Sequence, residues 1–211
     1  MKTHVLILPG LYNSGPQHWQ SIWEDAFPSV SRVQQDDWET PVCADWVGRL
    51  EREVACVGNN SVLVAHSLAC TLVAKWAEKH PRTISGALLV APSDTEAPTY
   101  PSGTEGFAPI PLQQLPFRSI VVVGSNDPYV TTTRAELFAH SWGSELAVVG
   151  DVGHIGSDSG LGIWTEGLAF LAQLTGDNRF TTMRRWLSGP RSDTPRAKER
   201  ETRRDLRCMI E

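Results

Sequence analysis

Short, continuous apolar runs alternate with longer helix-like segments along this chain, and this alternation limits the possible folds more than any other feature. Uninterrupted apolar runs are typical of parallel strands that are buried on both faces. Strands that alternate with helices predict an α/β fold, a mostly parallel sheet with helices on both faces. The predicted strands are residues 4–8, 31–34, 61–65, 86–91, 119–124 and 145–149, and the predicted helices are residues 15–26, 42–57, 68–80, 132–141 and 163–175. Thr40 is expected to cap the second of these helices, with Pro41 in its first turn.

The third apolar run leads directly to Ser67, which stands between two small residues, Ala65 and Ala69. A helix-like segment follows at once. This pattern is typical of a nucleophile elbow, in which the chain turns sharply and exposes a serine hydroxyl at the carboxyl edge of the sheet. The usual pattern is G-x-S-x-G, and alanine replaces both glycines here. An elbow predicts two partners, a later acid and a still later histidine, each following a strand.

Two residues meet this expectation. Asp127 lies just past the run 119–124, on a turn set by Pro128, and His154 lies just past the run 145–149. The order serine, acid, histidine is the order found in the α/β-hydrolase fold. In that arrangement His154 takes the proton of the serine hydroxyl as it attacks a carbonyl, and Asp127 orients and stabilises the imidazole.

An attack on a carbonyl also needs N–H groups that bind the developing oxyanion. The backbone N–H of Leu68, directly after the serine, is one expected donor, and that of Leu11, after the first strand, is the other. The segment 92–117 is rich in Pro, Gly and Ser and is expected to be a long excursion near the substrate entrance. Further residues that could line the pocket are His18, Trp19 and Trp38.

Each of the three catalytic candidates also has a plain structural interpretation, as a helix N-cap, a turn residue and a hydrogen-bonded surface histidine. Asp94 is the alternative acid, because it follows the run 86–91. Cys70 is close to the serine in sequence but is expected to pack the elbow helix. His66 is also expected to have a packing role, because adjacent side chains diverge at an elbow.

Further motifs lie along residues 4–174, at 9–11 (PGL) with 14–20 (SGPQHWQ), 35–38 (QDDW), 44–46 (ADW), 64–68 (VAHSL), 107–111 (FAPIP), 126–129 (NDPY), and 153–155 (GHI) with 158–162 (DSGLG). Together they resemble the small serine hydrolases of the YdeN and retinoblastoma-binding-protein-nine family. The resemblance implies a compact α/β-hydrolase fold without a large cap domain, and it implies Ser67, Asp127 and His154 as the triad. Ala69 departs from the family, whose members usually have glycine two residues after the nucleophile.

Charge is distributed unevenly. The chain has a net charge of −5, but residues from 177 onward hold ten Lys or Arg and six Asp or Glu, a net +4 that leaves −9 for residues 1–176. We therefore expect a hydrolase domain at 1–176 and a basic, flexible C-terminal extension at 177–211. An acidic body offers no basic surface for nucleic-acid phosphates, so no nucleic-acid partner is expected.

The sequence also lacks the patterns that mark several other functional classes. No apolar run is long enough to span a bilayer, so no membrane partner is expected. The run 4–8 is too short for a signal-peptide core, which favours a cytoplasmic protein. The six histidines are scattered without metal-ligand spacing, and no glycine-rich nucleotide loop follows a strand. Neither a metal nor a cofactor is therefore expected.

The sequence thus predicts a serine hydrolase that acts on small carboxylic esters, or amides, through an acyl-enzyme. The alternative is a weak or inactive protein of the same fold that acts by binding. Three features motivate this alternative: the methyl group of Ala69, tryptophans that look exposed, and the appended tail. The oligomeric state stays open.

Overall fold

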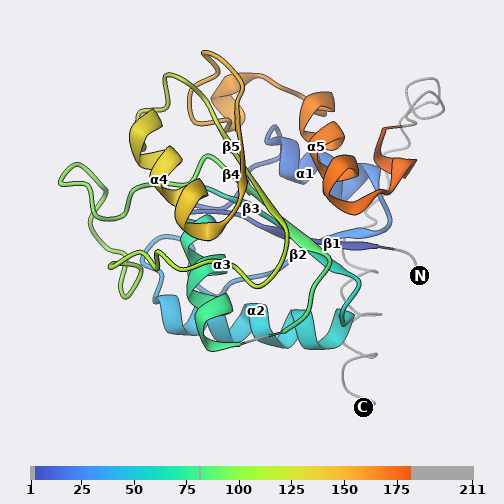
Figure 1. The fold of residues 1–211 in the computed structure, drawn as a ribbon, viewed down its shortest axis with the longest axis horizontal. Coiled ribbons are helices and arrows are strands. Elements are labelled where there is room, and N and C mark those ends of the chain that lie inside the picture. Colours follow the sequence, from blue (N-terminus) through green and yellow to red (C-terminus); the bar gives the residue numbers. More distant parts are fainter. Residues whose placement is uncertain (1–2, 81, 182–211) are drawn as a thin grey trace.

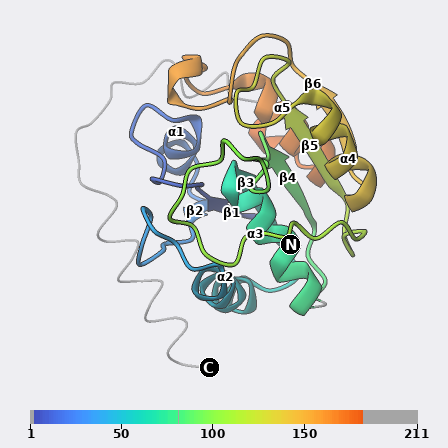
Figure 2. The ribbon, with the colours of Figure 1, turned by 90° about the vertical axis from the view of Figure 1, so that its left-hand side faces the viewer.

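The computed structural model describes residues 3–80 and 82–181. Its six strands form one parallel sheet in the order β2-β1-β3-β4-β5-β6, and they follow one another in this order across Figure 2. The strands are β1 (His4–Leu8), β2 (Val30–Arg32), β3 (Ser61–His66), β4 (Gly86–Val90), β5 (Ser119–Val123) and β6 (Glu145–Val148). The predicted fold class and strand number are therefore confirmed.

Helices cover both faces of this sheet and enclose two apolar clusters (Figure 1). Successive side chains of a strand point to opposite faces, so an uninterrupted apolar run supplies both clusters at once. In β3, Leu63 and Ala65 belong to one cluster, while Val62 and Val64 belong to the other. The first cluster is covered by α2 (Cys43–Val57), α3 (Leu68–Lys79) and α4 (Thr132–Trp142), and the second by α1 (Trp19–Ala26) and α5 (Thr165–Thr175).

The direction of strand addition reverses between β1 and β3, which are hydrogen-bonded neighbours. Ligands of open α/β sheets bind at such a switch point, beyond the carboxyl ends of the strands. A fully buried side chain, Gln20, joins the two strand ends here. Its amide donates to the carbonyl oxygens of Leu8 (3.2 Å) and Val64 (3.1 Å), and its own oxygen accepts from Ser14 Oγ (2.7 Å). The switch point is thus held rigidly.

The long segment between β4 and β5, residues 91–118, contains neither a helix nor a strand and forms no large cap domain. Glu105 anchors it to the start of α2: its N–H donates to Pro41 O (2.9 Å) and its carbonyl accepts from Cys43 N–H (2.8 Å). Phe107 is buried against Trp46, with ring centroids 5.6 Å apart. This excursion is therefore packed on the domain.

Three helices begin later than predicted, including α5, which begins at Thr165 rather than at residue 163. The first helix begins at Trp19 rather than residue 15, and His18 caps it by accepting from Gln20 N–H at 3.1 Å. The second has Val42 rather than Thr40 as its N-cap, because pairing with Glu105 keeps the preceding residues extended. The first strand was predicted correctly, and the ends of the other strands differ from the predicted ones by at most two residues.

The C-terminal end of the described chain packs on the domain. A 3₁₀ turn at Asn178–Phe180 follows α5, and Phe180 is buried against Phe27 with ring centroids 5.4 Å apart. Most of the predicted extension, residues 182–211, lies outside the described residues. Among residues 3–80 and 82–181, no helix combines the length and the hydropathy needed to cross a membrane.

Candidate active site

Ser67 occupies the sharp turn between β3 and α3, with φ 59° and ψ −125°. A positive φ is unfavourable for a residue with a β-carbon, and such strain is concentrated at functional sites. Ser67 occupies the N-cap position of α3, but its side chain forms no capping hydrogen bond with the helix. Its small neighbours, Ala65 and Ala69, are both fully buried. The local geometry is that of the predicted elbow.

The loop after β1 lies directly against this elbow. A β-carbon placed on Gly10 would be 2.7 Å from Ser67 Cβ and 3.2 Å from Leu68 N, so only glycine allows this approach. Leu11 follows Gly10 in this loop and packs, half-buried, against the first apolar cluster. The two segments predicted to supply oxyanion donors, at Leu11 and Leu68, are therefore brought together.

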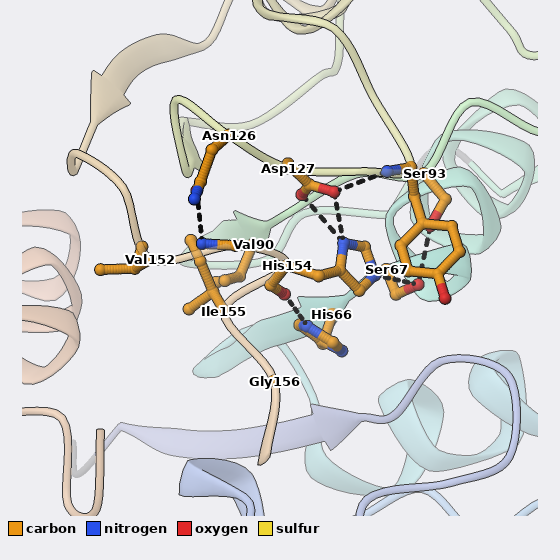
Figure 3. Close-up of polar contacts among 12 residues, drawn as sticks. His66, Ser67, Val90, Ser93, Asn126, Asp127, Val152, His154, Ile155 and Gly156 are labelled. Carbon is orange, nitrogen blue, oxygen red and sulfur yellow. Dashed lines mark hydrogen bonds and ion pairs between the residues drawn. The ribbon is translucent and has the colours of Figure 1, made fainter. Parts of the chain in front are cut away.

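His154 lies between Ser67 and Asp127, although the three residues follow different strands (Figure 3). Its Nε2 is 2.8 Å from Ser67 Oγ, and its Nδ1 is 2.9 Å from both carboxylate oxygens of Asp127. The Asp127 side chain is fully buried. An ionised carboxylate only accepts hydrogen bonds, so the neutral imidazole donates from Nδ1. Nε2 is then free to accept from the Ser67 hydroxyl.

The loops that carry the acid and the histidine are tied to each other. Asn126 Oδ1 accepts from Gly153 N–H at 2.6 Å, and Asp127 Oδ1 also accepts from Tyr129 N–H at 2.9 Å. The Tyr129 ring meets the His154 ring edge-on, with centroids 4.6 Å apart. Sequence reasoning found Asp127 and His154 but missed these supports, since a side-chain contact between two loops leaves no pattern in the chain.

His66 supports His154 from the other side. Its Nε2 donates to the carbonyl oxygen of His154 at 2.8 Å, and burial lowers the pKa of His66 well below the usual range. The His18 ring lies 4.7 Å from the His66 ring. Burial, with smaller contributions from Arg32 and His154, lowers the pKa of His18 to about 4. Both supporting rings therefore stay neutral at neutral pH.

Ser93 is a polar neighbour of Ser67 that the sequence did not reveal. Its Oγ is 2.7 Å from Ser67 Oγ, and the residue is only 1% exposed. Ser93 follows Pro92 at the start of the 91–118 segment, where no periodicity marks a side chain as inward-facing. The available signal was its place just beyond the apolar run of β4, at the sheet edge where Ser67 was expected.

The other residues that the sequence offered for this site, Asp94, Cys70 and Trp19, have structural contacts of their own. The carboxylate of Asp94 pairs with Arg134 at 3.0 Å. Cys70 is buried with its Sγ 3.4 Å from Val90 O, and burial raises the pKa of its thiol well above the usual range. Trp19 lies in the second apolar cluster, and its indole N–H donates to Ile155 O at 2.8 Å, next to His154. It is therefore a core residue that supports the histidine loop.

The described tryptophans do not form an exposed surface. Trp38 is half-buried and packs against Trp46 with ring centroids 5.4 Å apart. The remaining described tryptophans are buried, and these are Trp19, Trp23, Trp46, Trp76, Trp142 and Trp164. The expectation of exposed tryptophans, which was one reason for the binding-protein alternative, is therefore wrong for the described residues. In the described part of the chain, no group of three or more His, Cys, Asp or Glu side chains is placed to hold a metal ion.

Comparisons with known proteins identify the family of this chain. A family model described as serine hydrolase matches residues 5–173. Among solved structures, a protein described as a YdeN-like hydrolase from Pectobacterium atrosepticum is 31% identical over 83% of this chain and 91% of its own, with a TM-score of 0.74. No curated protein sequence matches the chain.

Two more distant structures share the fold. The YdeN gene product of Bacillus subtilis is 20% identical, over 83% of this chain and 100% of its own, with a TM-score of 0.69. Carboxylesterase CesB of Bacillus subtilis is 13% identical, over 83% of this chain and 84% of its own, with a TM-score of 0.60. The α/β-hydrolase fold and the resemblance to YdeN-like proteins are thus confirmed.

Proposed function

Because this chain belongs to the serine hydrolase family, we propose that it hydrolyses small carboxylic esters, or amides, through an acyl-enzyme formed on Ser67. One observation carries the proposal: hydrogen bonds run from Ser67 through His154 to the buried carboxylate of Asp127. The carboxylesterase among the structural neighbours supports esters as the substrate class.

In the first half of the reaction, Ser67 Oγ attacks the carbonyl carbon while its proton moves to His154 Nε2. The backbone N–H groups of Leu11 and Leu68 bind the oxyanion of the tetrahedral intermediate. Asp127 stabilises the imidazolium that forms and keeps its Nδ1 proton in place. His154 then gives the Nε2 proton to the leaving alkoxide or amine, and the acyl group stays on Ser67.

In the second half, a water molecule takes the place of the leaving group. His154 Nε2 accepts its proton as the water oxygen attacks the acyl carbon, and a second oxyanion forms at the same N–H groups. The intermediate collapses when His154 returns the proton to Ser67 Oγ. The products are a carboxylic acid and an alcohol or amine, and the resting enzyme is restored.

Exposed aromatic side chains near the candidate site indicate which substrates it prefers. Tyr129 contacts the His154 ring and remains 44% exposed, and Tyr12, one residue after Leu11, is 63% exposed. The Tyr129 ring thus presents apolar surface beside His154, and Tyr12 adds apolar surface to the loop that carries Leu11. We therefore expect esters with an apolar acyl or alcohol group to be better substrates than charged ones.

The test is covalent labelling with a fluorophosphonate, read by intact mass, together with hydrolysis of short p-nitrophenyl esters. The proteins are wild type, Ser67→Ala and, as a matched control, Ser119→Ala, which removes a buried serine hydroxyl far from Ser67 along the chain. We expect one adduct on wild type and on the control, and none on Ser67→Ala. Hydrolysis by Ser67→Ala at the wild-type rate would disprove the proposal.

A further inference from the structure

Ser93 is held rigidly beside the nucleophile. The chain reaches it through Ala91, which has a positive φ of 48°, and through Pro92, whose ring fixes its own φ. The next residue, Asp94, donates its N–H to Tyr129 O at 3.0 Å and pairs its carboxylate with Arg134. The loop that carries Ser93 is thus joined to the loop that carries Asp127.

The direction of the hydrogen bond between the two serines follows from its neighbours. Asp127 accepts from His154 Nδ1, so His154 Nε2 is unprotonated and accepts from the hydroxyl of Ser67. Ser67 has one hydroxyl proton, and that proton is already committed to His154. The 2.7 Å contact between the two Oγ atoms therefore requires Ser93 to donate to Ser67.

We propose that Ser93 is a positioning residue for Ser67, a role that rests on the proposed function. By donating to one lone pair of Ser67 Oγ, it leaves the other lone pair to attack the substrate carbon and keeps the Ser67 proton directed at His154. As that proton leaves, the Ser93 hydroxyl stabilises the negative charge that develops on Ser67 Oγ. Ser93 keeps its own proton throughout, so no new bond is formed or broken.

The same hydrogen bond acts when the acyl-enzyme breaks down. Ser67 Oγ is then the leaving group and develops negative charge until His154 protonates it. Ser93 is in place to stabilise that charge, so both chemical steps depend on its hydroxyl. A donor that matters mainly in the transition state changes kcat more than KM.

The experiment compares wild type, Ser93→Ala and Ser93→Cys by ester hydrolysis and by fluorophosphonate labelling rate. Cysteine nearly conserves the volume of serine but is a weak donor. The matched control is Ser119→Ala, because Ser119 Oγ makes a similar contact of 2.6 Å with Ser144 Oγ and is only 4% exposed. It removes a buried serine–serine hydrogen bond that is outside the candidate site.

We expect Ser93→Ala and Ser93→Cys to lower kcat and the labelling rate by about 10- to 100-fold, with KM within about threefold of wild type. Ser119→Ala should lose a similar amount of thermal stability with no change in kcat. Three results would overturn the role of Ser93: activity of Ser93→Ala close to wild type, full activity of Ser93→Cys, or an activity loss that only follows the unfolded fraction. Inactive, unlabelled wild-type protein would instead refute the proposed function itself.

Discussion

The backbone of Gly124 lies directly against the carbonyl group of Gly153. A β-carbon at position 124 would collide with that oxygen. Gly124 follows β5 and leads to Asp127, while Gly153 precedes His154. The separation between acid and histidine is therefore set by main-chain contact, in addition to the hydrogen bond from Gly153 N–H to Asn126.

Gly124→Ala should consequently push the two loops apart and weaken the hydrogen bond between His154 and Asp127. We expect kcat to fall by about 10- to 100-fold, because small misplacements of catalytic groups are costly. The control is Gly156→Ala, where an added β-carbon meets nothing within 4 Å and φ is −102°. Steady-state kinetics with a p-nitrophenyl ester measures both. Equal effects of the two substitutions would contradict the interpretation.

Gly10→Ala tests the contact between the oxyanion loop and the elbow. Its β-carbon would lie 2.7 Å from Ser67 Cβ and 2.9 Å from His66 O, so the loop must move away from Leu68. We expect kcat to fall by about 100-fold or more, since one oxyanion donor is displaced. Gly15→Ala, which adds a β-carbon in open space, should keep wild-type kcat. A Gly10→Ala protein with unchanged kcat would place the oxyanion site elsewhere.

Asp127→Asn tests the identity of the acid. An amide no longer fixes the proton on His154 Nδ1, so we expect kcat to fall by about 10³- to 10⁴-fold with the fold retained. Asp94→Asn is the matched substitution at the rival position, where the carboxylate binds Arg134. Its kcat should stay within about tenfold of wild type. If Asp94→Asn proved the more damaging change, Asp94 would be the acid.

His18 makes the stability of the fold depend on pH. Its pKa is about 4 in the folded protein against an ordinary value of 6.5, so between these values the unfolded chain binds a proton that the folded chain does not. This stabilisation is complete above pH 6.5 and is lost as the pH falls towards 4. The loss amounts to about 3 kcal/mol in the free energy of unfolding.

His18→Asn should remove this contribution, because asparagine keeps an acceptor for the N-cap of α1 but does not titrate. Urea unfolding at pH 7 and at pH 4 measures the difference. Wild type should lose about 3 kcal/mol more than the variant over this interval. His66, which is also buried and neutral, contributes in the same direction in both proteins. Identical losses would show that His18 is not buried as a neutral ring.

Ala69→Gly tests whether the methyl group of Ala69 at the elbow prevents Ser67 from reacting. In the structure Ala69 is buried while Ser67 keeps its 2.8 Å contact with His154, so we expect similar labelling rates for both proteins. Glycine in α3 should lower stability by about 1 kcal/mol. Rapid labelling of Ala69→Gly beside unlabelled, folded wild type would favour the binding-protein alternative.

The sequence predicted the fold and the grouping of Ser67, Asp127 and His154 for one physical reason. Each residue lies within a few positions of the end of an apolar run, and parallel strands all end at the same edge of their sheet. The pattern of apolar residues therefore located the three side chains in space without any knowledge of their contacts. Their catalytic roles remain predictions that the experiments above test.

What the sequence could not predict depends on contacts between distant segments. Ser93 reaches Ser67 only because the end of β4 lies beside the end of β3, and nothing in its own neighbourhood marks it as buried. The start of α2 was misplaced because Glu105, far along the chain, pairs with the residues around Val42. Local propensity favours a cap at Thr40, but tertiary hydrogen bonds override it.

The strand order has a consequence for when the candidate site forms during folding. Leu11, Ser67, Asp127 and His154 follow β1, β3, β5 and β6, so they meet only when the sheet is assembled across nearly its whole width. Pairing of parallel strands joins segments that are distant in sequence, and such contacts form slowly. We therefore predict that during refolding a covalent serine probe labels Ser67 only in a late step, after the sheet has assembled.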